Sequence, residues 1–295
     1  MSGADRHAGR IEGSDPKLKV SSSMSQQKNP YQPQKGVIEK IIPETPGIKT
    51  FVVRPENGFS FRCGQFAELT VPGIGEGPFA MSSPFFKPEL LEFTIQNVGY
   101  MTSRLHQMKE GDVVGVRGPY GNGFPLEEFY GREVLLLIGG VGFPPARALL
   151  YSLLKEKHKY PRILMCYGAR TPEEIVYKYQ IEDFRKKIEL HLTVDKADKN
   201  WTETEGVVTV LLDKVRVNLK NSVAVVIGPP VMMKFGTLKL LDVGYKPEDI
   251  YLSMERKMYC GIGQCRHCLI DHYFICKDGP VFTYEQLKDF PDIWE

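Results

Sequence analysis

No uninterrupted apolar run in this sequence is long enough to cross a membrane. The longest apolar stretch, residues 134–154, is broken by glycines, by Pro144 and Pro145 and by Arg147. A spanning helix needs about 20 consecutive apolar residues, so this stretch is typical of a strand, a turn and a helix. We predict no membrane span, and because no secretory signal is recognisable we expect a cytoplasmic protein.

An excess of charge of one sign is also lacking. The sequence contains 38 basic and 36 acidic residues, for a formal net charge of +2. It therefore has no broad basic field to attract a nucleic acid, and we predict no such partner. With 295 residues and 42% apolar content, the chain is long enough for two globular domains and a small additional module.

Large apolar side chains are rare in residues 1–30, which are rich in Ser, Lys, Gln and Gly. Such a segment cannot bury enough surface to offset the entropy lost on ordering. We expect a disordered leader or tag here, with Met24 as an alternative start. The sequence does not distinguish a natural tail from an expression leader.

Cysteine is scarce except near the C-terminus. Four of the six cysteines have the spacing Cys-x4-Cys-x2-Cys-x7-Cys, namely Cys260, Cys265, Cys268 and Cys276. The first three follow the spacing of plant-type [2Fe-2S] proteins. Gly261 and Gly263 would let the backbone fold closely around a cluster. The spacing therefore predicts that the four thiolates bind iron.

Two other interpretations of these cysteines remain open. Structural zinc sites usually pair two short knuckles across a longer span, whereas here three candidate ligands share one loop. A disulfide pair is the second alternative, although the lack of a secretory signal disfavours it. Cys63 and Cys166 do not share the spacing, and we predict that they are ordinary buried thiols.

The first globular region, residues 36–125, consists of short β-rich runs separated by Gly and Pro, which predicts an antiparallel barrel. Its expected strands span residues 37–42, 49–54, 65–71, 91–98 and 112–117, and one helix is expected over residues 102–108. Thr102 and Ser103 would offer capping hydroxyls to that helix.

The second region, residues 133–253, alternates apolar strands with helices, which predicts a doubly wound parallel sheet covered on both faces. Its expected strands span residues 134–138, 163–167, 188–194, 224–227 and 249–252. Its expected helices span residues 145–157, 172–185, 207–215 and 231–243.

Two glycine turns are expected at the carboxyl edge of this sheet, where open α/β sheets bind ligands. The first contains Gly139, Gly140 and Gly142 directly before a helix, whose free N–H groups suit a pyrophosphate. The second is the run Gly228, Pro229 and Pro230. The first turn is not a full Gly-x-Gly-x-x-Gly fingerprint, and a bare glycine turn is also compatible with a tight junction.

Arg170 follows the second predicted strand, where dinucleotide sites often carry an acidic residue. Its guanidinium would favour NADPH by pairing with the adenosine 2'-phosphate, or would reach a pyrophosphate instead. A solvated loop arginine is the remaining alternative.

Two segments of the predicted barrel are candidates for contact with a phosphorylated aromatic ligand. Residues 99–104 place hydroxyls and Arg104 at a helix start, which suits a phosphate. Residues 78–84 combine an aromatic with small side chains that could cover a flavin ring. An ordinary capped helix and a plain barrel core would have similar sequences.

In their order along the chain, these motifs resemble the ferredoxin-NADP reductase superfamily. The resemblance is closest to its branch of flavin and iron–sulfur electron-transfer subunits, known from dihydroorotate dehydrogenase B, anaerobic sulfite reductase and the gamma subunits of sulfhydrogenases. It spans about residues 29–285 and is carried by residues 29–31, 78–84, 99–105, 116–125, 139–142, 167–170, 228–232, 255–265 and 276–282.

The resemblance implies an FAD-binding β-barrel over residues 31–130, an NAD(P)H-binding α/β domain over residues 131–253 and a [2Fe-2S] module over residues 254–295. The implied flavin contacts are Pro78, Phe79, Ala80, Met81, Ser82, Gly99, Met101, Thr102, Ser103 and Arg104. The implied nucleotide contacts are Gly139, Gly140, Gly142, Arg170, Gly228, Pro229 and Pro230. No side chain is expected to act as a general acid or base.

The resemblance also implies a redox partner subunit, because electrons leaving the cluster need a docked acceptor. The first expectation is a hydrogenase or sulfhydrogenase complex, and the alternatives are dihydroorotate dehydrogenase and sulfite reductase. A regulatory module that has lost its flavin is a further alternative.

The sequence departs from the family pattern in two places, the flavin segment and the nicotinamide site. Gly77, Phe79 and Ala80 stand where the family has arginine, tyrosine and serine, so Arg104 or the helix start must carry more of the phosphate charge. Ile227 replaces a cysteine beside the nicotinamide and can contribute only packing. Near the cysteines, cationic side chains could offset an anionic cluster, namely Arg256, Lys257 and Lys277.

Overall fold

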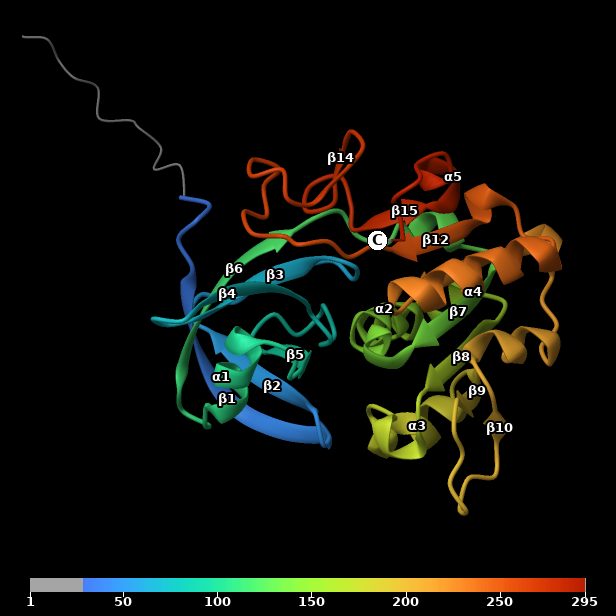
Figure 1. The fold of residues 1–295 in the computed structure, drawn as a ribbon, viewed down its shortest axis with the longest axis horizontal. Helices are drawn as coiled ribbons and strands as arrows, with labels where there is room; N and C mark the ends of the chain where they lie inside the picture. Colours follow the sequence, from blue (N-terminus) through green and yellow to red (C-terminus); the bar gives the residue numbers. More distant parts are fainter. Residues whose placement is uncertain (1–28, 295) are drawn as a thin grey trace, which may run out of the picture.

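The computed structural model describes residues 29–294, in which two domains lie side by side and the C-terminal segment lies against both (Figure 1). The predicted leader lies outside the described residues, except for Asn29 and Pro30. No helix within residues 29–294 is long and apolar enough to cross a membrane.

The first domain is an antiparallel six-stranded sheet curled into a barrel. Its strands are β1 (Gln34–Thr45), β2 (Ile48–Pro55), β3 (Phe66–Val71), β4 (Gly75–Ala80), β5 (Leu91–Gln96) and β6 (Val113–Tyr120), in the order β4-β3-β6-β1-β2-β5. The end strands β4 and β5 contact each other. Side chains that alternate along the strands, such as Phe51, Leu69 and Phe93, fill the interior.

Strand β4 is missing from the sequence prediction. It contains two glycines and Pro78, residue types that are depleted in strands. The structure accommodates them because β4 pairs only with β3 and lies at an edge of the sheet, where proline removes no ladder hydrogen bond. Its other edge leaves backbone N–H and C=O groups available to a ligand.

The second domain is a seven-stranded sheet flanked by helices. Its strands are β7 (Glu133–Gly139), β8 (Ile163–Ala169), β9 (Glu189–Val194), β10 (Thr204–Glu205), β11 (Ser222–Ile227), β12 (Ile250–Ser253) and β15 (Val281–Thr283), in the order β10-β9-β8-β7-β11-β12-β15. The main helices are α2 (Phe143–Lys155), α3 (Lys178–Arg185) and α4 (Pro230–Val243). All pairings are parallel except that of β12 with β15.

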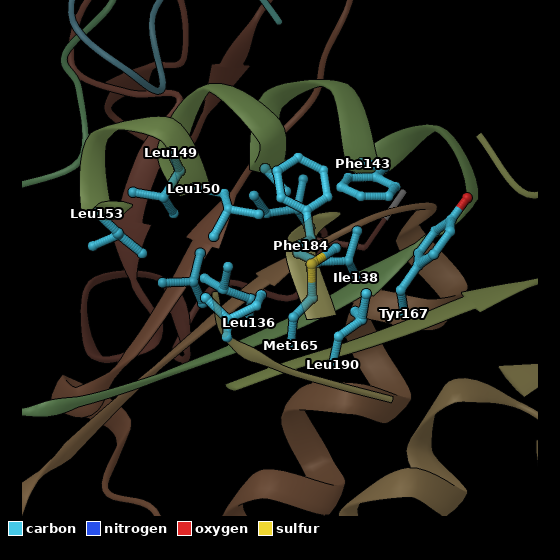
Figure 2. Close-up of a cluster of buried hydrophobic side chains, with 14 of the residues drawn as sticks. Leu136, Ile138, Phe143, Leu149, Leu150, Leu153, Met165, Tyr167, Phe184 and Leu190 are labelled. Atoms are coloured by element: carbon cyan, nitrogen blue, oxygen red, sulfur yellow. The ribbon is translucent and has the colours of Figure 1, made fainter. Parts of the chain in front are cut away.

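Both faces of this sheet are buried, which explains its nearly continuous apolar strands. Leu136 and Ile138 of β7 point to the core beneath α2 and α3, where Figure 2 shows them facing Leu149, Phe143 and Phe184. The intervening Leu135 and Leu137 belong to the opposite core, together with Met233 and Leu240 of α4. One strand thus anchors helices on both sides of the sheet.

Two of the predicted helices are wrong in extent or type. The helix expected over residues 172–185 is interrupted by Tyr177, whose φ of 56° is left-handed, so α3 starts only at Lys178. The helix expected over residues 207–215 is a 3-10 helix, Val208–Asp213. In both places tertiary packing overrides the local helical pattern.

The remaining elements are short. Helix α1 (Tyr100–Gln107) follows β5, while β13 (Leu269–Ile270), β14 (Tyr273–Phe274) and α5 (Tyr284–Leu287) belong to the C-terminal segment. Strand β15 of that segment completes the edge of the second sheet. The predicted fold class, a barrel, a doubly wound sheet and a C-terminal module, is confirmed. The domain boundaries stay predictions.

Candidate functional site

A cleft of about 650 Å³ opens at the carboxyl edge of the second sheet. It lies where β7 and β11 end, and the barrel closes part of it through Ile48 and Gln96. The predicted residues that line it are Gly139, Gly140, Arg170 and Pro229. A cleft at this edge, between two domains, is a common location for a nucleotide in α/β proteins.

The two glycine turns meet at the floor of this cleft. A Cβ on Gly142 would lie 2.4 Å from the Ile227 carbonyl oxygen, and a Cβ on Gly228 would lie 3.1 Å from the Gly139 carbonyl oxygen. Gly140 adopts a left-handed φ of 49°. A side chain at position 142 would collide with the Ile227 backbone, and the left-handed φ of Gly140 also favours glycine. Both turns lie at the N-terminus of α2, where Pro144 occupies the first turn.

Arg170 lines the same cleft but has an acidic neighbourhood. Its Nε donates to a Glu174 carboxylate oxygen at 2.7 Å, and 71% of its side chain is exposed. Asp195, which follows β9 and was not singled out in the sequence, lines the cleft beside them. Burial raises the pKa of Asp195, while Arg170 opposes that shift. The sequence could have indicated Asp195 through its position directly after the predicted strand over residues 188–194.

The predicted flavin segment runs along and beyond β4. Pro78, Phe79 and Ala80 are partly exposed, whereas Met81 and Ser82 are buried. Ser82 donates its amide and its hydroxyl to the Glu92 carbonyl, at 2.8 and 3.1 Å. The next hydroxyl, Ser83 Oγ, is buried and has no hydrogen-bond partner within residues 29–294. An open strand edge beside an unpartnered hydroxyl is compatible with a bound flavin ring.

At the predicted phosphate site, Gly99 precedes α1, and most side chains already have structural partners. Thr102 Oγ1 accepts from the Val98 and Gly99 amides at 3.1 and 2.9 Å, and Ser103 Oγ donates to Asn97. Met101 packs against the barrel core. Arg104 is exposed, with its guanidinium 5.3 Å from the Tyr100 ring centroid. The first-turn amides and Arg104 are therefore the groups that fit a phosphate.

The four clustered cysteines lie within residues 260–276 of the C-terminal segment, which we call the cysteine loop and which includes the short hairpin of β13 and β14. The thiols of Cys260 and Cys265 interact with each other, as do those of Cys268 and Cys276. No three His, Cys, Asp or Glu side chains of the described chain converge as a single metal ion requires. Two pairs of thiols are compatible with an iron–sulfur cluster, which takes four cysteine ligands.

Backbone amides of this loop point at the sulfur atoms. Gln264 N donates to Cys260 Sγ at 3.3 Å and Gly263 N donates to Cys276 Sγ at 3.2 Å. Gly261 and Gly263 have left-handed φ values of 76° and 75°, which turn these amides inward. Burial alone would raise the pKa of Cys260, but the amides lower it on balance. These amides thus favour a thiolate at Cys260, whereas burial and the neighbouring Cys268 raise the pKa of Cys276 to about 12.

Cys63 and Cys166 are buried and free, as predicted, and burial raises their pKa values to about 11 and about 12. Lys277 lies over Gly263 in the cysteine loop, whereas Arg256 donates to the Asp292 carbonyl. Lys277 is thus placed directly against the loop.

The domain interface contains a buried arginine that the sequence did not single out. Arg147 of α2 pairs with Glu92 of β5 and donates to the Ser82 carbonyl at 3.3 Å. Its guanidinium lies 4.4 Å from the Tyr177 ring centroid, and the Tyr177 hydroxyl bonds to Thr94 at 2.5 Å. Its only sequence signal was a charge inside an apolar helix.

Comparison with known proteins agrees with this arrangement. Residues 136–237 match the oxidoreductase NAD-binding domain, and residues 255–288 match the iron–sulfur cluster binding domain of dihydroorotate dehydrogenase B. The sulfhydrogenase 2 gamma subunit of Pyrococcus furiosus is 36% identical over 280 residues, which cover 87% of this chain and 96% of the relative.

Two further relatives extend the comparison. A probable dihydroorotate dehydrogenase B (NAD(+)) electron transfer subunit of Methanocaldococcus jannaschii is 37% identical and covers 85% of this chain and 90% of the relative. A structure of NADH-dependent reduced ferredoxin-NADP oxidoreductase superimposes with a TM-score of 0.73 at 27% identity, covering 88% of this chain and 91% of that chain. The chain therefore belongs to the ferredoxin-NADP reductase-like electron-transfer subunits that combine an NAD-binding domain with a dihydroorotate dehydrogenase B-type iron–sulfur domain, and it is an oxidoreductase subunit.

Proposed function

We propose that this chain passes electrons between NAD(P)H and a redox partner subunit, through FAD on the barrel and a [2Fe-2S] cluster on Cys260, Cys265, Cys268 and Cys276. The observation that carries the proposal is the position of the barrel, which contacts both the nucleotide cleft and the cysteine loop. Gln96 of β5 lines the cleft, and Arg117 of β6 donates to the Cys260 carbonyl at 2.8 Å.

Each part of the chain has a distinct task in this proposal. The amides and the α2 N-terminus at Gly140–Gly142 hold the nucleotide pyrophosphate. Arg147 keeps the flavin segment at a fixed position relative to that helix, through the Ser82 carbonyl. The cysteine loop holds iron and donates amides to its sulfur ligands. When bound, FAD exchanges two electrons with the nicotinamide and single electrons with the cluster.

The cysteine loop also offers a route to a partner. Cys265 is the one cysteine of the four that is partly exposed, and both Tyr259, directly before the loop, and His267, within it, are exposed. An electron carrier bound there would lie near the molecular surface. The names of the relatives favour a hydrogenase or sulfhydrogenase complex, with a dihydroorotate dehydrogenase complex as the alternative.

Anaerobic purification followed by cofactor analysis tests the proposal. We expect two iron atoms and one FAD per chain, with visible absorption bands from both groups. Zinc in place of iron would contradict the cluster assignment. Iron without flavin would instead support the regulatory alternative, to which the glycine at position 77 would then have contributed by removing a phosphate partner.

A further inference from the structure

Arg117 of β6 is buried beneath the cysteine loop, with 2% of its side chain exposed. Nε donates to Glu76 Oε2 at 2.9 Å, and Nη1 donates to the Tyr120 hydroxyl at 3.0 Å and to the Cys260 carbonyl at 2.8 Å. Nη2 donates to Glu76 Oε1 and to the Tyr259 carbonyl. All five N–H groups of the guanidinium are therefore used.

These partners belong to two different parts of the proposed electron path. Glu76 lies on β4, two residues before the flavin segment begins at Pro78. Cys260 is the first ligand of the proposed cluster. One rigid, planar guanidinium thus joins the flavin-binding strand to the cluster loop, a task that its fork of fixed donors suits better than a flexible lysine.

The cysteine loop also packs closely against Tyr120, a neighbour of Arg117 on β6. A Cβ on Gly261 would lie 2.6 Å from the Tyr120 ring, so the loop lies directly on that ring. The Tyr120 hydroxyl donates to the Pro30 carbonyl at 2.8 Å. Bonds to two successive carbonyls, at Tyr259 and Cys260, therefore hold a loop that is already packed closely.

Charge gives Arg117 a second effect. Reduction of a cluster adds one negative charge, which a nearby cation stabilises, and burial limits the screening of that cation by solvent. Glu76 offsets part of this positive charge. Its side chain is 33% exposed, so solvent screens the Glu76 charge more than it screens the Arg117 charge. Glu68, whose Oε1 lies 4.0 Å from Arg117 Nη2, is a second acidic neighbour. Because the guanidinium donates directly to the carbonyls of Tyr259 and Cys260, we expect its positive charge to dominate at the loop.

We propose that Arg117 is a positioning residue that fixes the first cluster ligand against the flavin-binding strand, and that its charge raises the reduction potential of the cluster. The inference rests on the proposed function, because it requires a cluster on the four cysteines. Removal of the arginine charge should lower the potential, whereas removal of the Glu76 charge should raise it.

Redox titration of the full-length holoprotein, followed by the electron paramagnetic resonance signal of the reduced cluster, tests this inference. The variants are Arg117→Gln, Arg117→Lys and Glu76→Gln. Arg162→Gln is the control, because Arg162 also pairs with carboxylates, Glu133 and Glu189, but at the start of β8. We expect Arg117→Gln to shift the one-electron equilibrium at least about tenfold toward the oxidised form, which is about 59 mV.

The direction of the other shifts separates this role from simple support of the fold. Arg117→Lys should recover most of the potential, Glu76→Gln should shift it upward, and Arg162→Gln should leave it unchanged. Shifts of the same sign in Arg117→Gln and Glu76→Gln, or no shift in either, would overturn the inference. If Arg117→Gln fails to fold, the potentials of Glu76→Gln and Arg117→Lys still test the inference, because an unchanged potential in Glu76→Gln would overturn it.

Iron analysis of the unmodified protein distinguishes the two levels of failure. Absence of a cluster there refutes the proposed function itself. A cluster whose potential does not respond to these substitutions refutes only the role of Arg117.

Discussion

Glu68→Gln should stabilise this protein at alkaline pH and leave its stability nearly unchanged at acidic pH. Glu68 lies on β3 with its side chain fully buried, and neither carboxylate oxygen has a hydrogen-bond partner within residues 29–294. Arg117 Nη2 is 4.0 Å away, but its donors are used by other groups. Burial therefore raises the pKa of Glu68 to about 8, although Arg117 opposes the shift.

The sign and the size of the effect follow from this shift. The folded chain binds the Glu68 proton more tightly than the unfolded chain, whose carboxyl has its ordinary pKa of 4.5. The stabilising effect of this proton is thus complete below pH 4.5 and is lost as the pH rises to about 8. At about 1.4 kcal/mol per pH unit over that interval, the loss in unfolding free energy is at most about 5 kcal/mol.

Glutamine has the shape of the protonated acid and does not ionise, so the variant avoids this loss. Thermal unfolding of the wild type and of Glu68→Gln, followed by calorimetry from about pH 5 to about pH 9, measures the effect. The difference in Tm should grow in favour of the variant as the pH rises. Glu189→Gln is the matched control, because side-chain bonds from His191 and Arg162 lower the pKa of Glu189 despite its partial burial.

The control should be destabilised at neutral pH and should show no gain toward pH 9. A Tm difference between Glu68→Gln and the wild type that stays constant over the whole range would refute the reasoning. It would mean that Glu68 is ionised in the folded protein and that water or another group satisfies it.

Three other variants test the cofactor sites. Cys265→Ser should abolish the electron paramagnetic resonance signal of the reduced protein, because it removes one of the four thiolates, whereas a signal of unchanged shape would contradict the ligand assignment. Thr102→Val combined with Arg104→Ala should weaken FAD retention by about 1 to 3 kcal/mol, measured by flavin titration of the apoprotein, and unchanged affinity would count against a phosphate at α1. Arg170→Ala should raise the KM for NADPH by up to about a hundredfold and leave that for NADH nearly untouched. Equal losses with both nucleotides would place Arg170 at a shared group, and no loss would identify a solvated arginine.

The sequence alone determined the features that depend on neighbouring residues. The continuous apolar run of β7 and the glycines that follow it encode a buried strand and a tight turn within about ten residues. The spacing from Cys260 to Cys276 similarly predicts a shared metal site, because three of the four thiols follow the spacing of plant-type [2Fe-2S] proteins. These local patterns were sufficient for the fold class and for the candidate cluster ligands.

Only the tertiary structure decided the contacts between distant segments. β4 becomes a strand because β3 supplies a partner, not because its glycines and Pro78 favour one. Tyr177 interrupts a helical pattern because its hydroxyl and ring meet Thr94 and Arg147 across the domain interface.

Arg117 gives the clearest example of such a contact. The Cys260 carbonyl that it holds is 143 positions away along the chain, and nothing in the residues around either one indicates the other. Their meeting depends on how the C-terminal segment packs against the barrel, where Arg117 of β6 donates to the Tyr259 and Cys260 carbonyls. Sequence periodicity reports which face of an element is buried, whereas the identity of the partner on that face is set by how the whole chain packs.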